Sequence, residues 1–402
     1  MIDSMIISQH TSDHLFLLIG SNPLPNWVAA HLLLKTDGLA YLVHSTKSVD
    51  VARRLARKLL SQGYRQPEYV PVQDASDAIE VYRAVRDRVS KIRAGQIGLN
   101  YTGGTKVMAV QAYRAVEREL GSGVPVPVFS YLDAGTLSLR IDGIKHAKFV
   151  GLDPRATLTL TELMELHDEF SVGGLNREPI AWPVVEALEK LHRSESDYKA
   201  WRGWITSRQR NPSLADTTFL EWPGAAATIA TTLAQGRPLT TTLGQLCKER
   251  AWPQSRISSP ERLVSWLEGE WIESYVLGIL KANQSLYQLN DFSQDLNIGK
   301  GPFQFQADVA AIRGYQLHFF TCWTGNNKQT AKYKLFEAFT RARQVGGDEA
   351  GAALVCMSEE PGSVEAEVAQ VMQTEGRVRV FGRRELEKLA QHLADWFKMN
   401  IP

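Results

Sequence analysis

The sequence predicts an α/β protein in which two domains, each with its own β-sheet, are joined by a helical region. Two observations predict this class. Strands alternate with helices over the first 150 residues, and a new helix, hairpin, helix, strand pattern begins near residue 256. We therefore expect a Rossmann-like domain over residues 1–150, a connecting region over residues 151–255 and a second α/β domain over residues 256–402.

In the first domain, short apolar runs are separated by stretches with the periodicity of helices. Strands are expected at residues 14–20, 39–44, 70–71, 97–100, 126–132 and 136–141. Helices are expected between them at residues 24–34, 48–60, 75–92 and 107–120. This alternation indicates parallel βαβ units, and the turn at residues 133–135 indicates that the last two strands form an antiparallel edge pair.

The rest of the chain is more helical. Helices are expected at residues 158–170, 178–195, 260–282, 332–344 and 385–399. Strands are expected at residues 303–308, 315–323, 352–357 and 378–381. The last domain should therefore have an α/β core distinct from that of the first.

The composition is that of a globular protein, with 44% hydrophobic and 22% charged residues. Because 45 Lys and Arg residues balance 44 Asp and Glu residues, the charge excludes a protein that coats nucleic acid by bulk charge, although it allows a local basic site. No apolar run is long enough for a membrane helix, and the N-terminal segment lacks a signal-peptide pattern. Three cysteines without metal-type spacing indicate a reducing compartment, so we expect a cytoplasmic protein with no membrane partner.

The run GLNYTGGTK at residues 98–106 lies between a predicted strand and a predicted helix. Its glycines let the backbone approach a ligand closely, and the free N–H groups at a helix N-terminus favour an anion. Because the Walker A spacing is absent, this is phosphate-binding chemistry of another kind. A second loop, GSNPLPN at residues 20–26, follows the first strand, and both loops should lie at the carboxyl edge of the sheet, where ligands bind.

The strand followed by N-x-T-G-G-T-K, together with the G-x-N-P-x-P loop, resembles the CARF domain of type III CRISPR ancillary proteins. The resemblance covers about the first 150 residues. It implies a homodimer that binds a cyclic oligoadenylate, most often cyclic tetra-adenylate, across its two-fold axis, and a symmetric ring also favours a symmetric receptor. Carried over by position, it implies the ligand-binding residues Ser21, Asn22, Asn100, Thr102, Gly103, Gly104, Thr105 and Lys106.

A second candidate site combines acids and a lysine in the last domain. Glu270 falls on an apolar stripe of the helix predicted at residues 260–282, and a carboxylate there is costly unless it is paired or bound to metal. Asp308 is expected on a strand, and Lys334 and Glu337 share one polar edge of the next helix. Carboxylates from a helix and a strand, with a nearby lysine, can hold Mg²⁺ or Mn²⁺ for phosphodiester cleavage.

The stretches WLEGEWIESYV, ADVAAIRGYQL and KLFEAFTRARQVGGDEA resemble PD-(D/E)XK nucleases, specifically the CARF-fused nucleases of type III CRISPR systems. The resemblance implies a restriction-endonuclease-like α/β fold for the last domain. Active members carry an E-x-K pair on the second strand of the hairpin. Here the glutamate position holds Thr321 or Cys322, and the lysine position holds Trp323 or Thr324. The metal therefore loses an oxygen ligand, and the developing charge loses a cation.

Residues of the following helix could replace the missing pair, with Lys332 or Lys334 as the cation and Glu337 as the ligand. We predict that Asp308 and Glu270 hold the metal and that Lys334 supports the scissile phosphate. The leading interpretation is a dimer that binds cyclic tetra-adenylate and controls a metal-dependent nuclease acting on single-stranded RNA or DNA, with activity retained, weakened or lost.

Two alternatives remain open. In the first, the CARF domain is a ring nuclease in which Ser21, Thr105 and Lys106 align the ligand's own 2′-hydroxyl for attack without metal, which would switch off the response. In the second, neither site is catalytic and the protein is a ligand-gated binding module.

Overall fold

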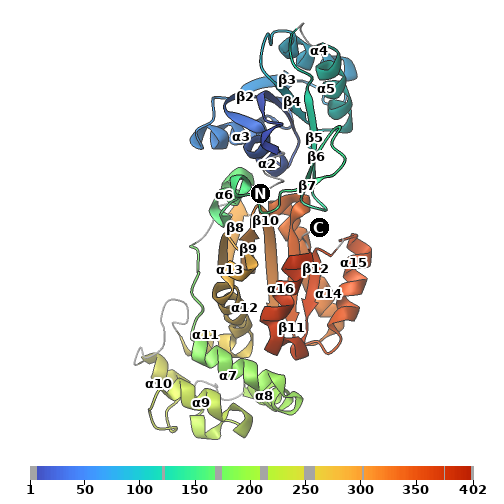
Figure 1. Cartoon of the computed structure of the whole chain (residues 1–402). Coiled ribbons are helices and arrows are strands. Elements are labelled where there is room, and N and C mark those ends of the chain that lie inside the picture. Colours follow the sequence, from blue (N-terminus) through green and yellow to red (C-terminus); the bar gives the residue numbers. More distant parts are fainter. Residues whose placement is uncertain are drawn as a thin grey trace.

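The computed structural model describes residues 7–119, 123–167, 174–208, 216–248, 259–300, 303–374 and 376–399. Figure 1 shows the N-terminal sheet at one end, the second sheet in the middle and a group of helices at the other end. The predicted fold class, with a Rossmann-like sheet and a separate C-terminal α/β sheet, is confirmed.

The N-terminal sheet has seven strands in the order β3-β2-β1-β4-β5-β6-β7. Their bounds are β1 Ser12–Ile19, β2 Leu34–Ser45, β3 Glu68–Val72, β4 Ile97–Asn100, β5 Val128–Asp133, β6 Ser138–Ile141 and β7 Lys148–Phe149. The first five strands pair in parallel, and β5-β6-β7 are antiparallel, as the sequence predicted for the edge pair. The helices between the parallel strands are α2 Leu24–Leu33, α3 Val49–Ser61, α4 Ala78–Val89 and α5 Lys106–Arg118.

The second sheet has the order β12-β11-β10-β9-β8. Its strands are β8 Asp291–Lys300, β9 Phe303–Arg313, β10 Gln316–Trp323, β11 Gly351–Cys356 and β12 Val378–Phe381. Around it lie α11 Pro260–Ser265, α12 Trp271–Ala282, α13 Gln284–Tyr287, α14 Lys328–Gly346, α15 Pro361–Met372 and α16 Leu389–Met399. The sequence analysis did not predict β8 and α15.

The middle of the chain divides between the two sheets. α6 Leu160–His167 lies at the junction of the sheets, whereas α7 Trp182–Arg193, α8 Glu195–Arg208, α9 Ala227–Ala234 and α10 Leu243–Lys248 form the far helical group (Figure 1). α7 and α9 share a buried apolar cluster with α12 and α16 of the second domain. The far helices therefore pack on the second domain and share its apolar core.

The two sheet domains also share a core. One cluster of buried apolar side chains contains Ile19 and Leu24 of the N-terminal domain together with Leu317 and Val345 of the C-terminal domain. Because apolar burial is the main stabilising contribution to folding, this shared cluster helps to keep the two domains in contact.

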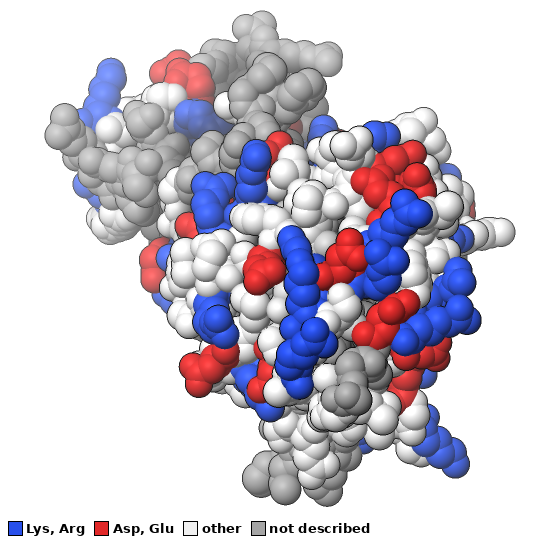
Figure 2. Space-filling model, turned by 90° about the horizontal axis from the view of Figure 1, so that it is seen from above, with Lys and Arg blue, Asp and Glu red and all other residues white. Residues whose placement is uncertain are grey.

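Both signs of charge are interspersed over the face of the N-terminal domain that Figure 2 shows. This pattern agrees with the balanced composition, because no single sign of charge coats that face. Among the described residues, no helix combines the length and the apolarity that crossing a bilayer requires.

Candidate functional sites

A pocket of about 480 Å³ lies at the carboxyl edge of the N-terminal sheet. Its walls come from four successive strand ends, with residues 19–21 after β1, 45–48 after β2, 73–76 after β3 and 104–105 after β4. The chain proceeds from β1 outward to β3 and then returns to place β4 on the other side of β1. The pocket therefore lies at the point where the strand order reverses, which is the ordinary ligand site of an open α/β sheet.

Close backbone contact between the loops after β1 and β4 explains the glycines of the TGGTK run. A Cβ on Gly103 would stand 2.1 Å from the carbonyl oxygen of Leu18, and a Cβ on Gly20 would stand 3.1 Å from the backbone nitrogen of Gly104. Gly104 also has a positive φ of 74°. Side chains at these positions would push the loops apart, so the glycines keep backbone amides at the pocket wall.

Thr105 fixes the start of α5 and ties two walls of the pocket together. Its hydroxyl oxygen accepts a hydrogen bond from the backbone N–H of Met108 at 3.1 Å and donates to the carbonyl oxygen of Ala75 at 3.0 Å. An N-cap of this kind leaves other first-turn N–H groups free for an anion. Lys106 is exposed at the first position of α5 and does not line the pocket.

Besides Lys106, four more of the eight predicted ligand residues do not line this pocket, and each of the four has a local structural role. Asn100 is buried, donates to the Ser130 hydroxyl at 3.1 Å and accepts from the backbone of Thr102 at 3.3 Å. Thr102 accepts from the backbone of Leu132 at 2.7 Å, and Gly103 packs on β1. These residues shape the loop that carries Gly104 and Thr105.

Asn22 is the fourth of these residues. Its side-chain oxygen accepts a hydrogen bond from the backbone N–H of Leu24 at 2.9 Å, which starts α2. Its amide nitrogen lies beside Gly347 of the second domain. Asn22 therefore faces the domain junction, whereas its neighbour Ser21 lines the pocket.

Sequence reasoning missed the pocket walls after β2 and β3. These walls supply Lys47, whose side chain is exposed, and the hydroxyl residues Ser48 and Ser76. The signal was available, because parallel neighbours of β1 must also end at the same edge of the sheet. No glycine motif marks those loops, so only the topology points to them.

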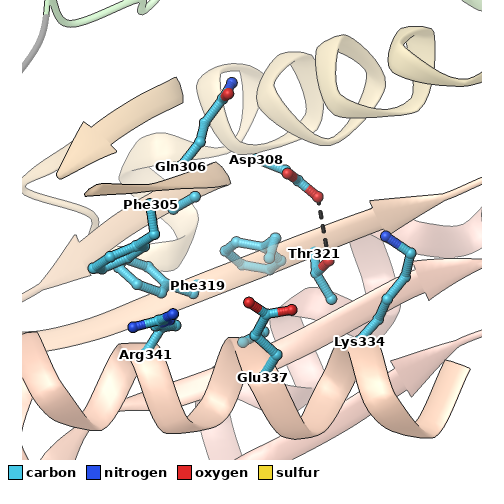
Figure 3. Close-up of a pocket in the computed structure, with 11 residues that line it drawn as sticks. Phe305, Gln306, Asp308, Phe319, Thr321, Lys334, Glu337 and Arg341 are labelled. Carbon is cyan, nitrogen blue, oxygen red and sulfur yellow. Dashed lines mark hydrogen bonds between the residues drawn. The ribbon is translucent and has the colours of Figure 1, made fainter. Parts of the chain in front are cut away.

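A second pocket, of about 150 Å³, lies between β9, β10 and α14. Figure 3 shows that Asp308 from β9, Thr321 from β10, and Lys334 and Glu337 from α14 surround it. The structure therefore brings the predicted Asp308 and Lys334 together, and it adds Glu337, the residue that could replace the missing ligand.

Asp308 is held rigidly at the wall of this pocket. Its Oδ2 atom accepts hydrogen bonds from the backbone N–H of Cys322 at 2.7 Å and from the Thr321 hydroxyl at 3.2 Å. Burial raises the pKa of Asp308, and the two hydrogen bonds and the Lys334 ammonium partly oppose that rise. A carboxyl whose charge is costly when unpaired is suited to gain a cation.

A break in strand alternation brings Asp308 to this side of the sheet. Strict alternation would place Phe305 and Asp308 on opposite faces of β9, yet both line the pocket. On the neighbouring strand β8, Leu296 pairs with Ala307 and Gln294 pairs with Val309, so Asp295 lies opposite Asp308. Asp295 has a positive φ of 50°. Ala307 and Val309 accordingly pack in different apolar clusters, so the strand face changes between them.

Glu270 does not reach this pocket, which corrects the prediction that it shares a metal with Asp308. Residues Trp266–Glu270 form a π-helical turn between α11 and α12. Because a π turn contains more residues than an α turn, it rotates Glu270 off the apolar stripe. Glu270 instead forms a two-bond ion pair with Arg262, at 3.1 and 3.0 Å.

The next acid of the helix, Glu273, faces the hairpin more closely. Burial raises the pKa of the Cys322 thiol, and Asp308 and Glu273 raise it further. Glu273 is therefore close enough to the β9-β10 hairpin to act on it electrostatically.

The positions of the missing E-x-K pair hold residues with structural roles. Trp323 folds over Gly325, and the hydroxyl of Thr324 donates to the carbonyl oxygen of Glu268 at 2.9 Å. Lys332 forms an ion pair with Glu367 of α15. Lys334, in contrast, lines the pocket.

The donor set fits a hard divalent cation. Mg²⁺ is commonly held by one or two carboxylates, with water and substrate phosphate as its other ligands. Asp308 and Glu337 supply two carboxylates in one pocket. Among the described residues, no three or more His, Cys, Asp or Glu side chains are grouped so that they could hold a metal ion.

Comparison with known proteins finds a family match in the second domain. Residues 260–400 match the family described as Card1-like, endonuclease domain. The C-terminal domain is therefore similar to Card1-like endonuclease domains, which supports a nuclease. The Asp308 pocket lies inside the matched segment. No curated protein sequence matches the chain.

Two solved structures share the fold of the whole chain. Can2 from Sulfobacillus thermosulfidooxidans, solved in complex with cyclic tetra-adenylate, is 16% identical, with a TM-score of 0.69 over 96% of this chain and 99% of that one. Protein VC1899 from Vibrio cholerae is 13% identical, with a TM-score of 0.69 over 97% of this chain and 99% of that one. These structures confirm the predicted two-domain fold, and the family match supports the predicted nuclease domain at the C-terminal end.

Proposed function

We propose that this protein is a nuclease whose C-terminal site is controlled by a cyclic oligoadenylate, such as cyclic tetra-adenylate, bound in the N-terminal pocket. The observation that carries the proposal is the pocket that joins Asp308 to Lys334 and Glu337 within the Card1-like endonuclease domain. The phosphate-binding geometry of Gly104 and Thr105, and the likeness of the fold to cyclic tetra-adenylate-bound Can2, support the ligand.

The catalytic proposal assigns one role to each pocket residue. Asp308 and Glu337 would hold Mg²⁺ or Mn²⁺, which supplies Lewis-acid chemistry at a phosphoryl oxygen when bound. Thr321 and the Cys322 amide fix Asp308 in place, so its free oxygen, Oδ1, points to one position. Lys334 would stabilise the charge that develops on the phosphate. We keep Glu270 out of this set because its carboxylate is paired with Arg262.

The ligand proposal assigns the pocket to half of a symmetric site. Ser21, Gly104 and Thr105 would contact the ring through hydroxyls and backbone amides, and Lys47 would supply a positive charge. A cyclic ligand with two-fold symmetry would then be shared between two copies of the chain related by an isologous contact. We include the homodimer in the proposal for this reason.

The test compares wild type with Asp308→Asn, and uses Glu270→Gln as a matched control. Each protein is incubated with single-stranded RNA, single-stranded DNA or supercoiled DNA, with and without cyclic tetra-adenylate, Mn²⁺ and EDTA. We expect cleavage by wild type that needs both the ligand and the metal. Asp308→Asn should lower the rate at least a hundredfold, whereas Glu270→Gln should stay within about threefold. Equal rates for wild type and Asp308→Asn would refute the assignment.

The same incubation tests the ring-nuclease alternative. Ring cleavage that survives EDTA and Asp308→Asn would place catalysis in the N-terminal pocket. The structure gives this alternative less support, because the Thr105 hydroxyl is already engaged by Met108 and Ala75, and Lys106 does not line the pocket. Tight ligand binding without any cleavage would support the binding module.

A further inference from the structure

A buried carboxylate without a hydrogen-bond partner on any other described residue lies where the two sheet domains meet. Glu349, which follows the end of α14, is 1% exposed, and its carboxylate oxygens have at most the N–H of their own backbone as a donor. Buried polar groups are normally hydrogen-bonded, so this carboxylate is able to accept a bond from a donor that moves toward it.

The nearest donor belongs to the ligand loop. The position that a Cβ on Gly347 would take lies 2.1 Å from the amide nitrogen of Asn22 and 2.7 Å from Oε2 of Glu349. The amide and the carboxylate therefore both lie near the point that a side chain of Gly347 would occupy. Gly347 has a positive φ of 74° and no side chain, so no side chain of this residue stands between them.

Asn22 is one residue from the pocket. Ser21 lines the N-terminal pocket, and Asn22 extends from the same turn toward the second domain. A ligand that moves the backbone of this short loop must also move the Asn22 amide. Because α2 begins at Leu24, only the turn itself is available to absorb such a movement.

α14 connects this junction to the nuclease pocket. Its last residue, Gly346, precedes Gly347, and its pocket face carries Lys334 and Glu337. A helix rises about 1.5 Å per residue, so the junction and Lys334 are roughly 20 Å apart on one rigid element. A shift or rotation at its end therefore reaches both pocket residues.

We propose that Asn22 and Glu349 are positioning residues that couple the N-terminal pocket to the nuclease pocket. In this coupling, the ligand moves the loop so that the Asn22 amide donates a hydrogen bond to Glu349. That hydrogen bond favours the position that α14 takes in the ligand-bound protein. The pairing exists in only one of the two arrangements, so it can shift the equilibrium between them. This inference rests on the proposed function, because it takes the ligand and the cleavage site from it.

The test measures binding, exchange and cleavage on the same full-length proteins. Glu349→Gln keeps the shape of the side chain and removes the carboxylate, and Asn22→Asp keeps the oxygen that starts α2 and removes the donor. Asp348→Asn is the matched control, since it removes one negative charge from the adjacent, exposed residue that pairs with Arg343. Cyclic tetra-adenylate binding is followed by calorimetry, and backbone amide exchange is followed over residues 342–351 with and without the ligand.

In wild type and Asp348→Asn, we expect the ligand to change exchange over residues 342–351 and to stimulate cleavage to similar extents. In Glu349→Gln and Asn22→Asp, we expect the ligand to bind, the exchange change to be lost, and the stimulation of cleavage to fall at least fivefold. The inference is overturned if wild type binds the ligand without an exchange change there, or if Glu349→Gln responds like wild type. Failure of the proposed function looks different, because wild type would then bind no ligand or cleave no nucleic acid. If wild type binds no ligand, the coupling is overturned as well. If wild type binds the ligand but cleaves no nucleic acid, the exchange measurement alone decides whether the coupling exists.

Discussion

The buried carboxyl of Glu349 makes a prediction about stability that does not depend on any ligand. Burial raises the pKa of Glu349 from its usual 4.5 to about 7; a hydrogen bond from its own backbone N–H partly opposes the rise, the neighbouring Asp348 adds to it and Arg377 opposes it. Because the folded pKa lies above the unfolded one, folding is penalised as the carboxyl ionises. The penalty is small at pH 4.5 and below, grows as the pH rises, and is complete above pH 7.

The size of this effect follows from the pKa difference. One pKa unit corresponds to about 1.4 kcal/mol, so the full penalty is about 3 kcal/mol at pH 8. At pH 5 most of the folded protein holds the proton on Glu349, and the penalty is about 1 kcal/mol. Glu349→Gln removes the ionisation, so its stability relative to wild type should improve by about 2 kcal/mol between pH 5 and pH 8.

Urea unfolding of the full chain at both values of pH measures this difference. The change with pH is the informative quantity, since a buried amide has its own unpaired groups whose cost is the same at each pH. Asp348→Asn removes an exposed charge beside Glu349, so its free energy of unfolding relative to wild type should differ by less than about 0.5 kcal/mol between the two pH values. A Glu349→Gln effect that is equal at pH 5 and pH 8 would refute the reasoning, because Glu349 would then not be an unpaired buried acid.

Three other predictions concern the two pockets. Thr105→Ala removes the cap of α5 and the bond to Ala75, so it should cost about 1 kcal/mol in unfolding experiments and weaken ligand binding in calorimetry; unchanged binding would mean that this wall is not used. Gly103→Ala places a Cβ 2.1 Å from the carbonyl oxygen of Leu18, so ligand affinity should fall at least tenfold, and binding like that of wild type would contradict the loop geometry. Lys334→Ala should lower the cleavage rate by about a hundredfold while Lys332→Ala, which breaks only the pair with Glu367, stays near wild type, and the reverse order would move the catalytic cation.

The sequence was sufficient for features that local chemistry fixes. The glycines at 103 and 104 were predicted to let the backbone approach a ligand closely; in the structure Gly103 lets the loop approach the carbonyl oxygen of Leu18, and the contact with a ligand stays a prediction. Asp77, Thr105 and Asn327 cap α4, α5 and α14 with their side chains. The sequence analysis predicted these helices from their periodicity but placed the starts of α4 and α14 a few residues away, at 75 and 332, because it did not use the caps.

Features that depend on distant partners were not predictable in this way. β8 has a polar composition, and its extended form depends on pairing with β9 along most of its length. The turn that rotates Glu270 away and the reversal of face at Asp308 both interrupt regular periodicity, which is the signal that sequence analysis uses. The second pocket therefore required the structure before its acids could be assigned.

The apolar cluster shared by the two sheets restricts how this chain can be divided. A cut near residue 150 would leave Ile19 and Leu24 on one fragment and Leu317 and Val345 on the other. Each fragment would then expose the apolar surface that the other now covers. Such fragments would tend to aggregate when expressed alone. Recombination that exchanged only the C-terminal domain would face the same obstacle, so the two domains are expected to be inherited as a pair fitted to each other.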